Sequence, residues 1–86
     1  MTDRQFRKII EKMKIGETIY INSINLSINQ IDYLRMAIRY RVLKPDMDEL
    51  RKAIKPEYIS AFLDGTSICP QMTYFKDSFN YWYDEK

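Results

Sequence analysis

The sequence contains no histidine, only two glycines and a single cysteine among its 86 residues. Histidine is the commonest general base and the commonest metal ligand, so its absence argues against the most frequent catalytic and metal-binding sites. Two glycines cannot build a glycine-rich phosphate-binding loop. Cys69 has no second cysteine for an internal disulfide, and we interpret it as a bystander thiol because no histidine is available to form its thiolate. We therefore expect a protein that is not an enzyme, with no catalytic residue, metal or cofactor.

Long apolar runs are also missing. No stretch approaches the roughly 20 apolar residues that a membrane-spanning helix needs. Residues 1–14 alternate charged and apolar side chains, which is not the pattern of a signal peptide. We expect a cytoplasmic protein with no membrane partner. A chain of this length is expected to form one domain, which we place at 1–78, followed by an aromatic and acidic segment at 79–86.

Capping signals predict four helices. The pairs Thr2–Gln5 and Ser27–Gln30 have the spacing of a capping box, in which two side chains bond the first backbone amides of a helix. Apolar residues at helical spacing follow each pair and predict helices at about 3–14 and 28–43. Shorter helices are predicted after Asp46, with Glu49 at the matching box position, and from Pro56 at a first helical position up to Gly65.

The remaining segments have extended character. Residues 17–21 alternate apolar and polar side chains and predict a strand. Residues 22–27 are either a second short strand, which would make a hairpin, or an extended lead into the next helix. Residues 66–76 also favour extended structure, with Pro70 limiting any strand there to an edge or dividing it. The pattern predicts an α+β, helix-rich fold with a minor β-sheet, and its order resembles a small winged-helix or helix-turn-helix domain.

Charge is distributed unevenly along the chain. Residues 1–55 carry a net charge of +5, and residues 56–86 carry a net charge of −3. A candidate nucleic-acid surface consists of the basic side chains on and after the second predicted helix: Arg35, Arg39, Arg41, Lys44, Arg51, Lys52 and Lys55. Arg35 and Arg39 lie one helical turn apart, where a phosphate would relieve their mutual repulsion. The alternative is an ordinary solvated surface with local ion pairs such as Asp32–Arg35.

Aromatic and apolar side chains form two candidate partner-binding groups. On the second predicted helix, Tyr33, Met36 and Tyr40 form an apolar stripe nearly opposite the main one. Near the end of the sequence, six of the ten residues from Tyr74 to Tyr83 are aromatic. Candidate anchors there are Phe79, Tyr81, Trp82 and Tyr83. Such rings either dock into a partner or pack back onto the domain, and the acidic flank argues against stacking on nucleic-acid bases.

The acidic cluster at residues 46–49 has two interpretations. A D-x-D arrangement can hold Mg²⁺, but acids at the start of a helix also cap its free amides and suit its dipole. We favour the capping role, since no partner groups for metal chemistry are present.

The size, the composition rich in Ile, Lys, Tyr and Asn, and the basic helix-rich body resemble small proteins encoded by mobile elements. One similar group is the small middle protein that lies between a polymerase and a helicase in cassette-chromosome replication operons. The resemblance implies an accessory protein that binds a larger enzyme, such as a polymerase. We therefore expect a non-catalytic accessory protein of mobile-element DNA replication or regulation. It would bind DNA through its basic helices and a larger enzyme through its aromatic residues. The alternatives are an inhibitor or adaptor that binds a host protein without nucleic acid, and a homodimer.

Overall fold

The computed structural model describes residues 1–66 and 69–77, which fold into helices packed on a three-stranded antiparallel sheet. The helices are α1 (Asp3–Lys12), α2 (Ile28–Arg39), α3 (Met47–Ala53) and α4 (Pro56–Leu63). The strands are β1 (Thr18–Ile21), β2 (Leu43–Pro45) and β3 (Met72–Lys76). The predicted α+β, helix-rich class is therefore confirmed. The segment 79–86, and with it the boundary of the predicted domain, lies outside the described residues.

Both predicted capping boxes are present. The amide of Gln5 donates to the hydroxyl of Thr2 at 3.1 Å, and the amide of Thr2 donates to the side chain of Gln5 at 2.9 Å. Ser27 and Gln30 make the same reciprocal pair at the start of α2. These bonds satisfy amides that the first turn of a helix leaves without partners. Both helices therefore begin where the sequence predicts.

The third helix begins at its predicted cap, but its box is not completed. Asp46 accepts from the amides of Asp48 and Glu49 at 3.0 and 3.3 Å. The Glu49 carboxylate instead accepts the amide of Thr73 in β3 at 2.7 Å, and the amide of Asp46 donates to the Thr73 carbonyl. Glu49 thus continues the hydrogen bonding of β3 beyond the end of β2. Pro56 occupies the first turn of α4, as predicted.

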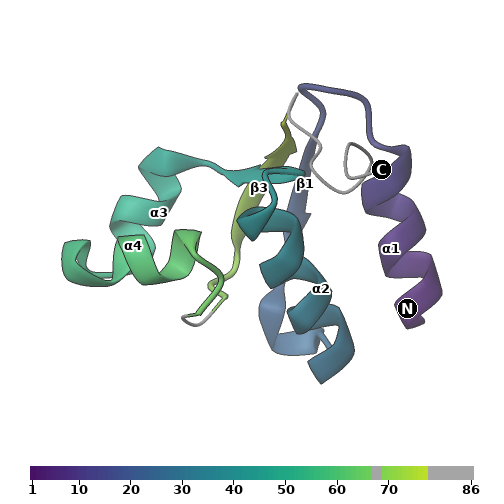
Figure 1. Cartoon of the computed structure of the whole chain (residues 1–86), viewed down its shortest axis with the longest axis horizontal. Helices are drawn as coiled ribbons and strands as arrows, with labels where there is room; N and C mark the ends of the chain where they lie inside the picture. Colours follow the sequence, from purple (N-terminus) through teal and green to yellow (C-terminus); the bar gives the residue numbers. More distant parts are fainter. Residues whose placement is uncertain (67–68, 78–86) are drawn as a thin grey trace.

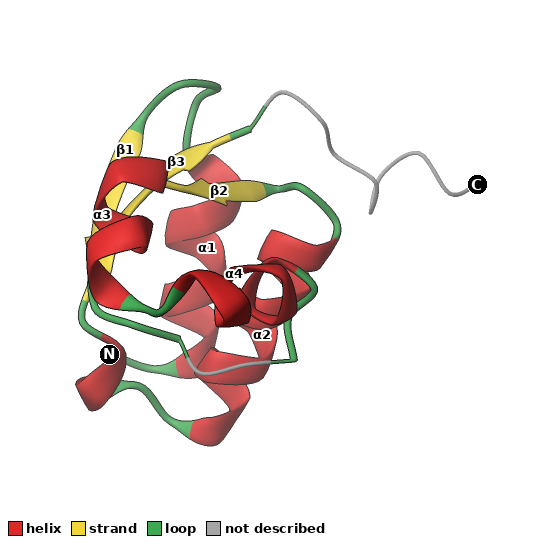
Figure 2. Ribbon diagram, turned by 90° about the vertical axis from the view of Figure 1, so that its left-hand side faces the viewer, coloured by secondary structure: helices red, strands yellow, loops and turns green. Residues whose placement is uncertain are grey.

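The sheet has the strand order β1-β3-β2, so β3 is the central strand (Figure 2). Along β3, Met72, Tyr74 and Lys76 are buried, whereas the two residues between them are half-buried. Pro70 lies two residues before β3, so it neither divides that strand nor confines it to an edge, although the sequence analysis expected one or the other. Pro45 lies in the edge strand β2, where a missing amide is tolerated. β2 and β3 are neighbours in the sheet but are separated along the chain by α3 and α4. They are therefore not a hairpin wing, and the winged-helix form of the fold stays a prediction.

Two sequence expectations are corrected by the backbone. Residues 23–25 form a 3₁₀ turn capped by the side chain of Asn22, so residues 22–27 are neither a second strand nor a simple extended lead. α2 ends at Arg39 rather than near residue 43, because the chain leaves the helix to form β2. The sequence analysis did not predict β2, which contains only three residues.

All four helices contribute to one core on the face of the sheet that carries its buried side chains. In Figure 1, α2 lies between α1 on one side and α3 and α4 on the other. α1 packs through Phe6, whose ring meets Tyr33 of α2 edge-on at 6.2 Å. The buried Lys76 side chain joins β3 to α1 by donating to the carbonyl of Ile10 at 2.7 Å. Burial lowers the pKa of the Lys76 ammonium, and the carboxylate of Glu11 opposes this shift.

Candidate binding groove

Arg41 has an unusual backbone conformation just after α2. Its φ of 61° lies in the left-handed region and is the only positive φ of a residue other than glycine in the described part of the chain. The amides of Arg41 and Val42 bond back to the carbonyls of Ile38 and Ala37, at 3.1 and 2.7 Å. This is a Schellman motif, which ends a helix through one left-handed residue that is usually glycine. α4 ends in the same motif with Gly65, as the sequence predicted, at a φ of 77°.

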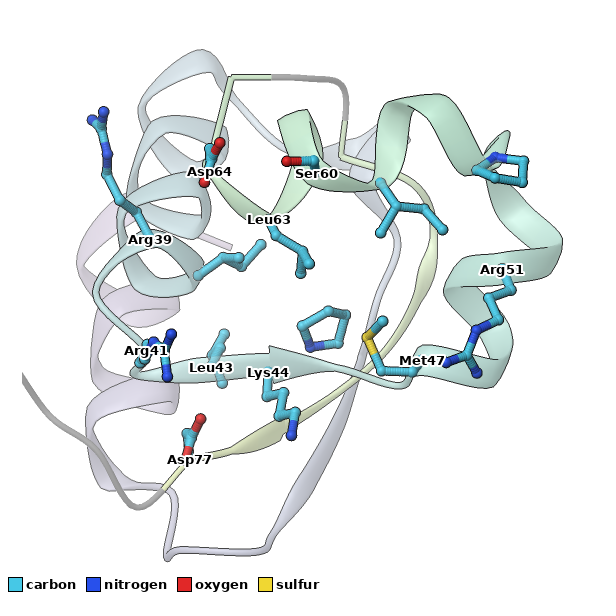
Figure 3. A pocket seen from close by; sticks show the side chains of 14 residues that line it. Arg39, Arg41, Leu43, Lys44, Met47, Arg51, Ser60, Leu63, Asp64 and Asp77 are labelled. Carbon is cyan, nitrogen blue, oxygen red and sulfur yellow. The ribbon is translucent and has the colours of Figure 1, made fainter.

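Beside Arg41, a groove of about 920 Å³ opens between α2 and β2 on one side and α3 and α4 on the other (Figure 3). We call it the basic groove. Its apolar residues are Ile38, Leu43, Pro45, Met47, Pro56, Ile59 and Leu63. Its polar residues are Arg39, Arg41, Lys44, Arg51, Ser60, Asp64 and Asp77. Figure 3 shows Leu63 and Met47 pointing into the groove, with Arg41 and Arg51 at opposite sides.

The groove thus brings together four of the seven basic residues that the sequence predicted, from α2, β2, α3 and the turn after α2. They differ in how far they are engaged. Arg51 makes an exposed ion pair with Asp48 at 3.3 Å, and the ammonium of Lys44 stands over the Phe75 ring at 5.9 Å. Arg39 and Arg41 are both exposed. Two carboxylates, on Asp64 and Asp77, share the rim with these four cations.

The other three predicted basic residues lie outside the groove. The backbone of Arg35 lies against the end of α4. A β-carbon added to Gly65 there would lie 3.0 Å from the Arg35 carbonyl oxygen. Arg35 pairs with Asp32 at 3.5 Å, as one interpretation of the sequence predicted. Lys52 and Lys55 are exposed but do not line the groove. The predicted basic surface is therefore divided, and Arg35 and Arg39 do not line one site together.

The predicted stripe of Tyr33, Met36 and Tyr40 is also divided. Tyr33 is only 9% exposed, because it packs on Phe6 and lies under the guanidinium of Arg7 at 5.4 Å. It belongs to the core rather than to an accessible surface. Met36 is 47% exposed, and Tyr40 is half-buried at the end of α2. Phe79, Tyr81, Trp82 and Tyr83 lie outside the described residues.

Cys69 and the acidic cluster have the surroundings of structural residues. Burial raises the pKa of the Cys69 thiol, although the nearby Arg35 opposes the shift, so the thiol is protonated at neutral pH. Asp46 caps α3, which confirms the favoured interpretation of that cluster. Within residues 1–66 and 69–77, no group of three or more His, Cys, Asp or Glu side chains is placed to hold a metal ion.

The sequence analysis missed the apolar half of the groove. Met47, Ile59 and Leu63 lie at apolar positions of their helices, but apolar spacing alone does not show that α3 and α4 leave part of these faces open beside β2. Asp64 and Asp77 were not singled out, since each becomes part of the site only through the packing of α4 and β3.

Comparisons of this chain with models of known protein families, with curated proteins and with solved structures find no match. In the part of the chain that the structure describes, none of the helices has the length and apolar character that crossing a bilayer demands.

Proposed function

We propose that this chain is a non-catalytic adaptor that binds a larger protein through the basic groove. The observation that carries the proposal is the combination of an apolar floor with a rim of four cations and two carboxylates. An amphipathic segment of a partner fits such a site, with apolar side chains on the floor and acidic side chains at the rim. Buried apolar anchors supply most of the affinity in such interfaces, and rim charges supply specificity and speed of association.

The backbone of Arg41 supports a functional role for this rim. A left-handed conformation costs a residue other than glycine about 1–2 kcal/mol, and such strained positions cluster at functional sites. α4 uses glycine in the same motif, whereas α2 has an arginine whose side chain lines the groove. We interpret Arg41 as a residue retained for its side chain at a cost in stability. In the setting that the resemblance implies, the partner is a polymerase or another replication enzyme of a mobile element.

A pull-down from the native host, treated with nuclease, tests this proposal. The groove variant combines Arg39→Glu with Arg41→Glu, and its control combines Arg4→Glu with Lys8→Glu on α1. Both pairs are exposed and change the net charge equally. We expect one protein to be retained by the wild type and the control but lost with the groove variant. The retained protein, once purified, should bind the wild type in calorimetry, and Leu63→Ala on the groove floor should weaken that binding. Recovery of the same proteins by all three forms would contradict the proposal.

A second function, binding of DNA along the rim, is favoured by the convergence of four cations from separate elements. Phosphate contacts give an affinity that falls steeply with salt, with a log–log slope of roughly one per contact. Fluorescence anisotropy with single-stranded and duplex DNA at about 50 mM salt distinguishes the two functions. DNA binding should be lost with the groove variant and should be insensitive to Leu63→Ala, because the floor offers nothing to a phosphate. Absence of binding by the wild type would leave the adaptor as the function of the groove.

A further inference from the structure

The basic groove has an acidic and aromatic segment of this same chain beginning at its edge. Asp77 lines the groove, and residues 78–86, which lie outside the described residues, follow it directly. We propose that this segment binds the basic groove of its own molecule and competes there with the partner. The competition rests on the proposed function, whereas binding of the segment to the groove requires no partner.

The chemistry of the segment matches that of the groove. It carries four aromatic side chains followed by the carboxylates of Asp84 and Glu85. The groove offers half-buried apolar side chains, Met47, Ile59 and Leu63, and the exposed guanidiniums of Arg39 and Arg41. An aromatic ring buries about 150–250 Å² when it packs, so one or two rings on this floor remove a large apolar area from water. The carboxylates of Asp84 and Glu85 then lie near the guanidiniums of Arg39 and Arg41, which attract them.

The length of the segment favours binding within one molecule. Nine residues span up to about 30 Å when extended, and the groove borders Asp77, the residue that directly precedes the segment. A short tether keeps the segment at an effective concentration of about millimolar, so even weak contacts hold it in place at protein concentrations far below that value. A second copy of the chain offers the same groove but not this advantage.

Trp82 is the only tryptophan of the chain, so its fluorescence reports on the segment alone. The experiment measures its emission wavelength and its quenching by acrylamide in the full-length wild type, the groove variant and the α1 control. We expect emission from the wild type and the control at shorter wavelength than from the protein unfolded in urea, together with protection from acrylamide. In Arg39→Glu/Arg41→Glu, the emission should shift to longer wavelength and the protection should be lost, while circular dichroism remains native.

Three outcomes overturn the inference. The first is a wild-type emission and quenching equal to those of the unfolded chain, which place Trp82 in water. The second is a protected Trp82 that the groove variant does not change, which places the segment elsewhere on the molecule. The third is protection that disappears on dilution, with a matching change in mass by light scattering, since the groove then holds the segment of a second copy.

The experiments distinguish failure of the adaptor function from failure of the internal competitor. If Trp82 is exposed while the groove variant still loses a protein partner, the adaptor function stands and the internal competitor does not. If Trp82 is protected by the groove but no protein depends on Arg39 and Arg41, the segment belongs to the fold and the adaptor function fails. If both hold, Trp82→Ala in the full-length chain should raise the affinity for the captured partner.

Discussion

At the scale of single residues, the most informative position is Arg41. Its φ of 61° is required by the Schellman motif that turns the chain from α2 into β2. The motif itself is well bonded, so the strain lies in the residue type and not in missing hydrogen bonds. Because Arg41 also lines the groove, stability favours glycine at this position whereas the proposed binding function favours arginine.

Replacing Arg41 with glycine should raise the free energy of unfolding of the domain, and it removes one of the four cations that line the groove. Glycine adopts the left-handed region without the penalty of a β-carbon, and we expect a gain of about 1 kcal/mol after allowing for the greater freedom of glycine in the unfolded chain. For a domain of this size, that gain raises the melting temperature by roughly 4–8 °C. Arg41→Ala removes the same charge but keeps the strained backbone, so it should leave the melting temperature nearly unchanged. Equal melting temperatures for the two variants would show that position 41 is not strained.

The buried Tyr74 should make the protein sensitive to alkaline pH. Burial raises the pKa of its hydroxyl far above the ordinary value of about 10, so the folded chain keeps a proton that the unfolded chain releases. The contribution of Tyr74 to stability is therefore constant below about pH 10 and falls as the pH rises above that value. The raised pKa of Cys69 acts in the same direction from about pH 8.5, and the lowered pKa of Lys76 acts in the opposite direction below about pH 10.4.

Thermal melts of the wild type and Tyr74→Phe between about pH 8 and about pH 11 isolate the contribution of Tyr74. Phenylalanine keeps the ring in the core and loses only a long hydrogen bond to the Pro70 carbonyl, at 3.4 Å. The melting temperature of the wild type should fall more steeply above about pH 10 than that of Tyr74→Phe. Parallel curves would mean that the Tyr74 hydroxyl ionises equally well in the folded state.

At the scale of elements, two hydrogen bonds to Thr73 join the start of α3 to the sheet, one from the Asp46 amide and one to the Glu49 side chain. β2 ends at Pro45, and the half-buried Glu49 accepts the Thr73 amide that lies beyond that end. A helix side chain thus substitutes for a strand carbonyl. Together the two bonds fix α3 against β3 and thereby set the position of Met47 and Arg51 at the groove.

Glu49→Ala should destabilise the domain by about 1–3 kcal/mol, because it leaves the Thr73 amide without its acceptor in a partly buried site. Glu49→Gln retains an oxygen acceptor and should recover much of the loss. Asp48→Ala is the matched control, since it removes an acid of the same helix turn and its exposed pair with Arg51 but no bond to β3, and it should cost about 1 kcal/mol or less. Urea unfolding measures all three. A loss for Asp48→Ala as large as that for Glu49→Ala would show that the helix start, not the bond to Thr73, dominates.

The difference between local and long-range interactions explains what the sequence could and could not predict. The starts of α1 and α2 are marked by residues three apart, that of α3 by its cap Asp46 and that of α4 by Pro56, so all four could be predicted from local sequence. The end of α4 was marked by Gly65, whereas the end of α2 has Arg41 in the glycine position and gave no signal. β2 is stabilised by pairing with β3, about thirty residues later, and local sequence carries no trace of that pairing. For the same reason four of the basic residues could be proposed, but not the apolar groove that unites them.

At the scale of the whole molecule, cations from separate elements of the basic part of the chain come together. Those of α2, β2 and α3 converge at one groove, and the acidic end of the sequence follows Asp77, which borders that groove. α1 carries another exposed basic pair, Arg4 and Lys8, and lies on the other side of α2 from α3 and α4 (Figure 1). Charge reversal of Arg4 and Lys8 on α1 therefore controls for any effect of net charge alone.

Salt should act on Trp82 with opposite signs in the wild type and in the groove variant. Raising the salt concentration from about 0.1 M to about 1 M shortens the Debye length from about 10 Å to about 3 Å, which weakens attraction and repulsion between exposed charges alike. In the wild type, protection of Trp82 from acrylamide should fall but not vanish, because contacts with the apolar floor persist. In Arg39→Glu/Arg41→Glu, the same salt screens the repulsion between the new carboxylates and those of Asp84 and Glu85, so protection should rise. The α1 variant should follow the wild type. A change of the same sign in all three proteins would show that salt acts on the fold or on the quencher, and that the charges of the groove do not hold the segment.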